Sequence, residues 1–170
     1  MSAFATRTNL LKAFGIGVLI AVLGIGGYVY FGDTARYQTV DGSDLPAITV
    51  YKSPTCGCCN DWIDHLRANG FTVRPQNVSS REALQQKYGL PRMMGSCHTG
   101  VVEGYVIEGH VPAEDVARLL RKNPPNVAGL TVPGMPVGSP GMEQGDRFDP
   151  FAVMAFTDDG RASVFSRYDR

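Results

Sequence analysis

The pattern of apolar and polar positions starts with a long uncharged run and then changes to short alternating segments. Residues 13–32 carry no charge and follow Arg7 and Lys12. About twenty apolar residues suffice to span a bilayer as a helix, and the cationic flank predicts that the N-terminus stays in the cytoplasm. We expect residues 1–32 to form an uncleaved transmembrane helix that anchors the chain, with a cleaved export signal as the alternative.

After a polar linker at residues 33–46, the pattern predicts one α/β domain over residues 47–170. Short β-branched apolar runs alternate with segments whose apolar residues recur every three or four positions. Strand and helix therefore alternate within about 45 residues, which argues for parallel strands joined by a crossover helix. The expected strands are residues 47–51 and 71–74 with an extended segment at 101–110, and the expected helices are residues 58–69, 81–88 and 113–121.

The last third of the chain has a different character. Residues 124–150 hold six of the eleven prolines and five glycines, and such a stretch resists regular structure. We expect it to wrap over the domain as an ordered loop or to form a flexible lid. The apolar runs 151–156 and 162–165 then flank Asp158-Asp159-Gly160, a strong turn signal that predicts a C-terminal β-hairpin.

Composition and motifs exclude several classes of function. The formal net charge is zero, so the chain has no basic footprint for nucleic acid. It contains no G-x-S-x-G elbow, no P-loop and no H-E-x-x-H motif. Four cysteines in an exported domain would ordinarily form two structural disulfides. However, three of them lie within four positions and two of these are adjacent, which fits that arrangement badly.

The cysteine cluster lies between the first expected strand and the first expected helix. A thiol at a helix N-terminus loses its proton more easily, and the thiolate attacks disulfides and binds soft metals. Cys56 and Cys59 form a C-x-x-C pair, whereas Cys58 adds a third sulfur that a dithiol exchanger does not need. The spacing therefore indicates a thiol-based site and leaves open whether its chemistry is redox or metal binding.

Cys97 and His98 form the second half of the site that we expect. The expected order β-α-β-α-β-β-α is that of a thioredoxin- or glutaredoxin-like domain, in which a loop that opens with a cis proline faces the C-x-x-C turn. Pro91 is the candidate for this proline, and the loop after it would bring Cys97 and His98 opposite the cysteine turn. Thiolate and imidazole together suit Cu(I), Zn(II) or a reactive thiol, and the surplus of sulfurs favours metal. The structural alternatives are a buried thiol or disulfide partner for Cys97 and a hydrogen-bonded loop residue for His98.

Other notable side chains are expected to have structural roles, although two methionines are also candidates for metal ligands. Met135 and Met142 stand in near-repeated Pro-Gly-Met units. Thioethers are soft ligands for Cu(I), but methionine more often fills an irregular apolar gap. The residues expected to serve only the core, a helix surface or a turn are Trp62, His65, Met93, Met94 and His110.

These motifs together resemble a known bacterial family. In order, they are Tyr51 to Cys59, Trp62 with His65-Leu66, Ser96 to Thr99, Glu108 to Ala113 and the two Pro-Gly-Met units. Over roughly residues 47–168 the chain is similar to CopG-like copper-resistance proteins, long catalogued as a domain of unknown function. The resemblance implies a thioredoxin-like fold in the periplasm and copper bound by Cys56, Cys58, Cys59 and Cys97, with His98 as a weaker candidate.

The resulting hypothesis is a periplasmic copper-binding protein that holds Cu(I) through its cysteine cluster and shuttles copper between Cu(I) and Cu(II) in copper resistance. Its partners would be copper ions, a copper-handling or redox protein, and the inner membrane if the N-terminal helix is retained. If that segment is cleaved, the protein would be free in the periplasm. The alternatives are a thiol-disulfide oxidoreductase with Cys56 and Cys59 as its catalytic pair, and a structural metal or disulfide module.

Overall fold

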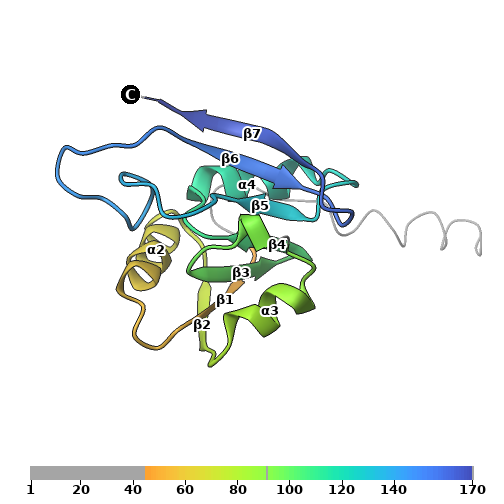
Figure 1. Ribbon diagram of the computed structural model, residues 1–170, viewed down its shortest axis with the longest axis horizontal. Coiled ribbons are helices and arrows are strands. Elements are labelled where there is room, and N and C mark those ends of the chain that lie inside the picture. The colour runs from red at the N-terminus through yellow and green to blue at the C-terminus, as the bar shows by residue number, and fades with distance from the viewer. Residues whose placement is uncertain (1–44, 91, 170) are drawn as a thin grey trace, which may run out of the picture. The chain divides into compact units, whose positions relative to one another are not determined.

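Seven strands form one mixed sheet in the order β2-β1-β3-β4-β5-β6-β7 (Figure 1). The computed structural model describes residues 45–90 and 92–169. The strands are β1 (Ile48–Lys52), β2 (Val73–Asn77), β3 (His98–Val102), β4 (Tyr105–Glu108), β5 (Gly129–Thr131), β6 (Phe151–Phe156) and β7 (Ala162–Tyr168). The helices are α2 (Gly57–Ala68), α3 (Arg81–Lys87) and α4 (Ala113–Lys122), with a 3-10 turn η1 (Arg92–Met94).

The expected N-terminal anchor, the linker up to residue 44 and the candidate cis proline Pro91 lie outside the described residues. Within residues 45–90 and 92–169, no helix has both the length and the apolar content that crossing a membrane requires.

The predicted strand-helix-strand unit is confirmed. β1 and β2 pair in parallel, with Ile48 opposite Val73 and Lys52 opposite Asn77, and α2 connects them. β2 starts two residues later than predicted and contains Pro75. β2 is an edge strand of the sheet. A proline is tolerated there because no further strand pairs with the open side of β2.

The next elements also follow the sequence pattern. Ser80 caps α3, since its hydroxyl accepts a hydrogen bond from the Ala83 N–H at 3.2 Å. The extended segment predicted at 101–110 is an antiparallel pair, β3 and β4. Glu103 and Gly104 join these strands with positive φ angles of 47° and 84°, which a two-residue hairpin turn requires.

β5 was missed by the sequence analysis, because it lies inside the proline- and glycine-rich stretch. This strand pairs in parallel with β4 and antiparallel with β6, and it thereby joins the C-terminal hairpin to the sheet. A Cβ at Gly129 would come within 1.9 Å of the Val106 carbonyl oxygen, so the close strand contact needs glycine. Leu130 is fully buried and anchors β5 in the core.

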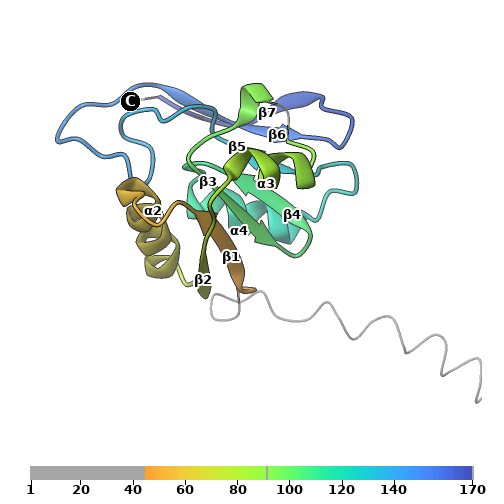
Figure 2. The ribbon, with the colours of Figure 1, turned by 60° about the horizontal axis from the view of Figure 1, so that its bottom comes forward.

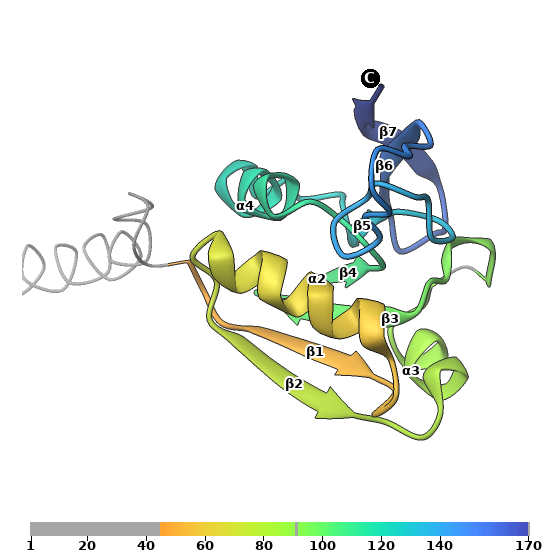
Figure 3. The same cartoon turned by 90° about the vertical axis from the view of Figure 1, so that its left-hand side faces the viewer.

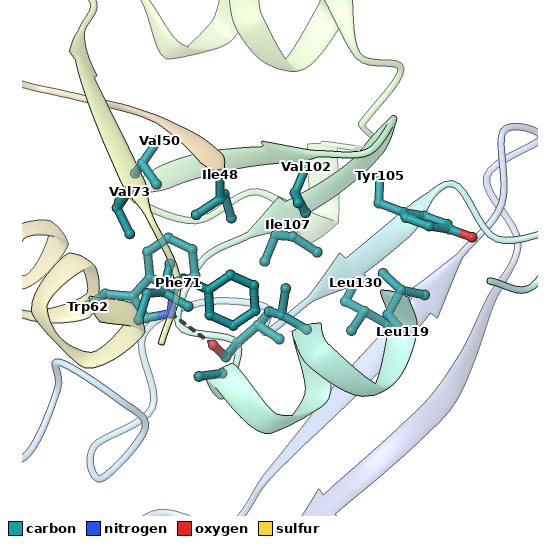
Figure 4. Close-up of a cluster of buried hydrophobic side chains, with 14 of the residues drawn as sticks. Ile48, Val50, Trp62, Phe71, Val73, Val102, Tyr105, Ile107, Leu119 and Leu130 are labelled. Atoms are coloured by element: carbon teal, nitrogen blue, oxygen red, sulfur yellow. Dashed lines mark hydrogen bonds between the residues drawn. The ribbon is translucent and has the colours of Figure 1, made fainter. Parts of the chain in front are cut away.

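The sheet separates two apolar cores. Helices α2 and α4 cover one face and α3 lies against the other (Figures 2 and 3). Ile107 belongs to the larger core and its neighbour Val106 to the smaller one, as the alternation of side chains along β4 dictates. In Figure 4 the larger core joins Trp62 of α2, Leu119 of α4 and Ile48 of β1.

The predicted C-terminal hairpin is confirmed, and a polar cluster joins it to α4. Asp115 is 2% exposed and pairs with Arg118. Its carboxylate also accepts hydrogen bonds from the Ser166 hydroxyl at 2.8 Å and the Tyr168 hydroxyl at 2.9 Å. This buried carboxylate therefore holds β7 against α4.

His65 connects α2 to α4 and makes stability depend on pH. Its Nε2 accepts a hydrogen bond from the Ala113 N–H at 3.0 Å, and burial lowers the pKa of this imidazole below its ordinary 6.5. At pH values between the lowered pKa of His65 in the folded chain and 6.5, the unfolded chain binds more protons than the folded chain. The contribution of His65 to the free energy of unfolding should therefore be fully present above pH 6.5 and should decrease as the pH falls below 6.5.

The prediction is that a His65→Gln variant loses part of this pH dependence. The glutamine amide oxygen can still accept the Ala113 N–H but does not titrate. Urea unfolding between pH 7.5 and 5 should show a shallower slope for His65→Gln than for wild type, and an unchanged slope for the exposed-site control Arg67→Gln. Equal slopes for wild type and His65→Gln would show that this histidine does not couple folding to protons.

Candidate metal centre

The cysteine turn occupies the N-terminus of α2, as the sequence predicted. Cys56 is the N-cap residue, so Cys58 and Cys59 are the second and third residues of the helix. In this described segment no side chain caps the helix, and its first turn carries no acidic residue. The positive end of the helix dipole and the free N–H groups are therefore not neutralised by the protein, and they favour thiolate there.

Four sulfur atoms meet at this turn. Cys56 and Cys59 form a disulfide bond, while Cys58 and Cys97 are free. The Cys58 Sγ lies 3.7 Å from the Cys56 Sγ and 3.8 Å from the Cys97 Sγ. All four sulfurs lie within 4.8 Å of one another. The expectation that folding brings Cys97 to the cysteine turn is therefore met.

The sheet register explains how Cys97 reaches the turn. β1 runs directly into the cysteine segment, and β3 pairs antiparallel to it with His98 opposite Lys52. Cys97 comes one residue before His98, so it lies beyond the end of this ladder on the side of α2. The pairing of two adjacent strands thus places a residue 38 positions after Cys59 against the helix N-terminus.

Two buried histidines face Cys97. The His98 Nδ1 lies 3.2 Å and the His110 Nε2 3.1 Å from the Cys97 Sγ. Each ring uses its other nitrogen on a backbone carbonyl: His98 Nε2 is 2.9 Å from the Gly109 oxygen and His110 Nδ1 is 2.8 Å from the Pro140 oxygen. A carbonyl can only accept, so these contacts fix the tautomers and leave the nitrogens near Cys97 as acceptors.

His110 was expected to be a structural turn residue, and its place in the site was missed. It forms a second group of candidate metal ligands with Cys97 and His98. A hairpin in the sequence could have predicted this position of His110. A two-residue turn at Glu103-Gly104 pairs Thr99 with Glu108, which places residue 98 beside residues 109 and 110. His65 lies outside both groups of candidate ligands, as the sequence analysis expected.

Burial controls the protonation of this centre. Desolvation, followed by the neighbouring Cys58 sulfur, raises the pKa of the Cys97 thiol to about 12. Desolvation also lowers the pKa of His110, which keeps this imidazole neutral and able to coordinate a metal. In the metal-free protein the Cys97 S–H is therefore retained, and a histidine nitrogen can accept it.

Trp62 packs the core, as expected, and also contacts one of the two histidines. It is fully buried in the larger core, and its indole N–H donates to the Val111 carbonyl at 2.8 Å (Figure 4). Its ring also lies 4.3 Å from the His98 ring, centroid to centroid. The side chain therefore packs α2 onto the sheet and closes one side of the imidazole.

The proline- and glycine-rich stretch forms an ordered strap across the site, here defined as residues 132–142. The Ser96 hydroxyl donates to the Gly134 carbonyl at 2.7 Å, and the Pro140 carbonyl binds His110. A Cβ at Gly141 would lie 2.7 Å from the Trp62 backbone nitrogen and 2.9 Å from the Cys58 carbonyl oxygen. The strap therefore packs closely against the first turns of α2.

The methionines divide between core and surface. Met94 packs against the smaller core, as expected. The prediction that Met93 is also a core residue was wrong: it is 92% exposed, because the short η1 turn covers the sheet with Met94 only. Met135 is 54% exposed and Met142 is partly buried.

The donor set fits a soft metal ion and depends on the redox state of the cysteine turn. With the disulfide closed, Cys97, His98 and His110 remain as one group, and the free thiol of Cys58 lies 3.8 Å from the Cys97 sulfur. Reduction adds the sulfurs of Cys56 and Cys59. Thiolates select Cu(I), whereas a set richer in imidazole also suits Cu(II).

The fold and the centre define an α/β protein with a cysteine- and histidine-rich candidate metal site. Two solved structures titled copper resistance protein CopG, forms 2 and 1, are similar to the chain. They are 48% and 49% identical to it, with TM-scores of 0.71 and 0.70. In both cases the alignment covers 74% of this chain and 100% of the solved one.

A family model described as a protein of unknown function, DUF411, matches residues 94–142, the part that carries Cys97, the histidines and the strap. No protein with a curated description matches the chain. At this identity and coverage the chain belongs to the family of CopG-like copper resistance proteins.

The strap yields a stability prediction. Gly141 and Gly134 both have positive φ angles, 82° and 74°, so alanine costs roughly 1–2 kcal/mol of backbone strain at either position. Only Gly141 faces a tight contact, since nothing lies within 4 Å of a Cβ at Gly134. Gly141→Ala should therefore lower the free energy of unfolding by about 1–3 kcal/mol more than Gly134→Ala, as measured by urea unfolding. Equal losses in the two variants would contradict the tight contact of the strap with α2.

Proposed function

We propose that this protein binds copper as Cu(I) through Cys56, Cys58, Cys59 and Cys97 and serves copper resistance. One observation carries the proposal: four cysteine sulfurs lie within 4.8 Å of one another at the N-terminus of α2. A purely structural disulfide pair does not need two further thiols and two tautomer-fixed imidazoles at the same place. Copper is the cargo in this proposal, and the titles of the similar solved structures support its choice over zinc.

The same centre can exchange electrons with its cargo. Reduction of the Cys56–Cys59 disulfide takes up two electrons and two protons and gives two thiols. Oxidation of two Cu(I) ions to Cu(II) supplies two electrons, so the exchange balances. The disulfide lies next to the free thiol of Cys58, and this contact supports a role in which the cluster shuttles copper between Cu(I) and Cu(II).

The fold and the location belong to the same proposal. A parallel β1-α2-β2 unit, an antiparallel β3-β4 pair and a following α4 support a thioredoxin-like arrangement that the additional strands β5 to β7 extend. A disulfide is typical of an oxidising compartment, which supports the periplasm. We place the domain there, held at the inner membrane by residues 1–32 if that segment is retained. A copper-handling or redox protein is the expected partner.

The prediction is that reduced protein binds at least one Cu(I) per chain and that Cys97→Ser weakens this binding. Loss of an outer hydrogen bond to a metal ligand already costs 10–100-fold in affinity, so loss of a ligand should cost at least about tenfold. An anaerobic titration in competition with a chromophoric Cu(I) chelator measures both affinity and stoichiometry. The matched control is Asn60→Ala, an exposed residue next to Cys59 on α2.

The outcome that would contradict the shared site is a Cys97→Ser variant with the stoichiometry and affinity of wild type. His110→Ala provides an independent measurement, since its Nε2 lies 3.1 Å from the Cys97 sulfur. Under oxidised conditions, where the disulfide leaves two imidazoles in the donor set, His110→Ala should weaken Cu(II) binding more than Cu(I) binding to reduced protein.

A second candidate function is thiol-disulfide exchange with protein substrates. The observation that favours it is the Cys56–Cys59 disulfide in a C-x-x-C turn at a helix N-terminus. Cys56 would be the attacking thiolate and Cys59 the resolving thiol, as in proteins with this motif. The Cys58 thiol at 3.7 Å from Cys56 would compete with a substrate for the disulfide.

Metal-free protein separates the two functions. If copper handling is the function, reduced protein freed of metal should reduce a mixed-disulfide substrate no faster than a small dithiol at the same concentration. Cys58→Ser is the informative variant: it should impair copper binding but leave a Cys56 and Cys59 exchanger intact or faster. Rapid metal-independent turnover that Cys58→Ser retains would favour the exchanger.

A further inference from the structure

A buried carboxylate underlies the metal centre. Glu108, the last residue of β4, is 1% exposed. Its Oε1 accepts hydrogen bonds from the Ser96 backbone N–H at 2.6 Å and from the Gln85 side-chain amide at 3.2 Å. Its Oε2 accepts one from the Thr99 hydroxyl at 2.6 Å. Donors thus face both oxygens, as a buried carboxylate requires.

These partners lie on both sides of the candidate ligands in the sequence. Ser96 precedes and Thr99 follows the pair Cys97-His98, and Glu108 itself stands two residues before His110. The same two segments also meet through the backbone, because the Gly109 N–H donates to the His98 carbonyl at 3.0 Å. One side chain therefore joins the two segments that carry Cys97, His98 and His110.

Ladder pairing alone does not fix the residue before β3. β3 begins at His98, so the Ser96 N–H lies outside the strand, and it donates to the Glu108 carboxylate instead. An apolar pair at positions 99 and 108 could hold β3 and β4 together equally well, since buried charges are seldom the most stable choice. What the carboxylate adds is a fixed direction for the chain at Ser96 and Thr99.

We propose that Glu108 is a positioning residue for the metal centre. Its carboxylate holds residues 96–99 so that the Cys97 sulfur and the His98 Nδ1 converge with the His110 Nε2. It acts through hydrogen bonds to the ligand-bearing segments and does not itself bind the metal. The inference rests on the proposed function for the identity of the metal, but the arrangement that it explains is present without metal.

The test compares Glu108→Ala and Glu108→Gln with a matched control on helix α4. In Glu108→Gln the amide oxygen accepts the Ser96 N–H, and the amide N–H donates to the Thr99 hydroxyl, which can also accept. Asp115→Ala is the control, because it also removes a buried carboxylate that accepts several hydrogen bonds, between α4 and β7. Unfolding free energies identify conditions in which all three variants are folded.

The first readout needs no metal. Imidazole ¹⁵N chemical shifts report the tautomer of each histidine, and in wild type His98 should be protonated at Nε2 and His110 at Nδ1. Glu108→Ala should shift the His98 resonances toward an average of both tautomers, whereas Glu108→Gln should restore the wild-type pattern. Asp115→Ala should leave it unchanged even if it lowers stability as much.

The second readout is the anaerobic Cu(I) titration. Glu108→Ala should weaken binding about 10–100-fold, and Glu108→Gln should recover most of that loss. Wild-type tautomers and affinity in folded Glu108→Ala would overturn the inference while leaving copper binding by wild type intact. A wild type that binds no copper would instead overturn the proposed function, and the metal-free tautomers would still test Glu108.

If Glu108→Ala does not fold, Thr99→Val tests the positioning role of Glu108 instead. This change removes one hydrogen bond to the Glu108 Oε2 and keeps the shape of the side chain. A shift of the His98 resonances in the same direction, smaller than a full tautomer change, supports the positioning role. Unchanged His98 resonances in folded Thr99→Val would overturn it.

Discussion

The contact on which the centre depends is the approach of the Cys97 sulfur to the first turn of α2. Its 3.8 Å distance to the Cys58 sulfur follows from the antiparallel pairing of β1 and β3, with His98 opposite Lys52. Because successive side chains of a strand alternate between faces, a shift of one residue in this pairing would move the Cys97 loop away from the helix. The buried core beneath α2 fixes the register, and the register fixes the site.

Two opposing electrostatic effects meet at this contact. The N-terminus of α2 favours negative charge, whereas burial disfavours it and raises the pKa of the Cys97 thiol to about 12. The sulfur at the helix end and the sulfur on the loop are therefore not equivalent. Cys97 retains its proton in the metal-free protein, and the same burial lowers the pKa of His110.

The sequence predicted what depends on short-range pattern and missed what depends on pairing between distant segments. The β1-α2-β2 unit, the Ser80 cap and the C-terminal hairpin are encoded by periodicity and turn residues close in the chain. β5 is three residues long, and its strand geometry comes from β4 and β6 on either side. His110 looks like a turn residue in isolation, and only the β3-β4 register shows that it faces Cys97. Met93 and Met94 are chemically identical, and only the packing of η1 separates exposed from buried.

The arrangement around Cys97 also bears on the choice between metal handling and thiol exchange. Thiol exchange would use the Cys56–Cys59 pair and has no need of Cys97, whose thiol keeps its proton because desolvation raises its pKa to about 12. The backbone carbonyls of Gly109 and Pro140 nevertheless orient two imidazole lone pairs toward this same sulfur. A soft metal ion could bind all three atoms and would displace the thiol proton, whereas a disulfide substrate would use neither imidazole as a ligand. The geometry beyond the C-x-x-C pair therefore favours metal handling.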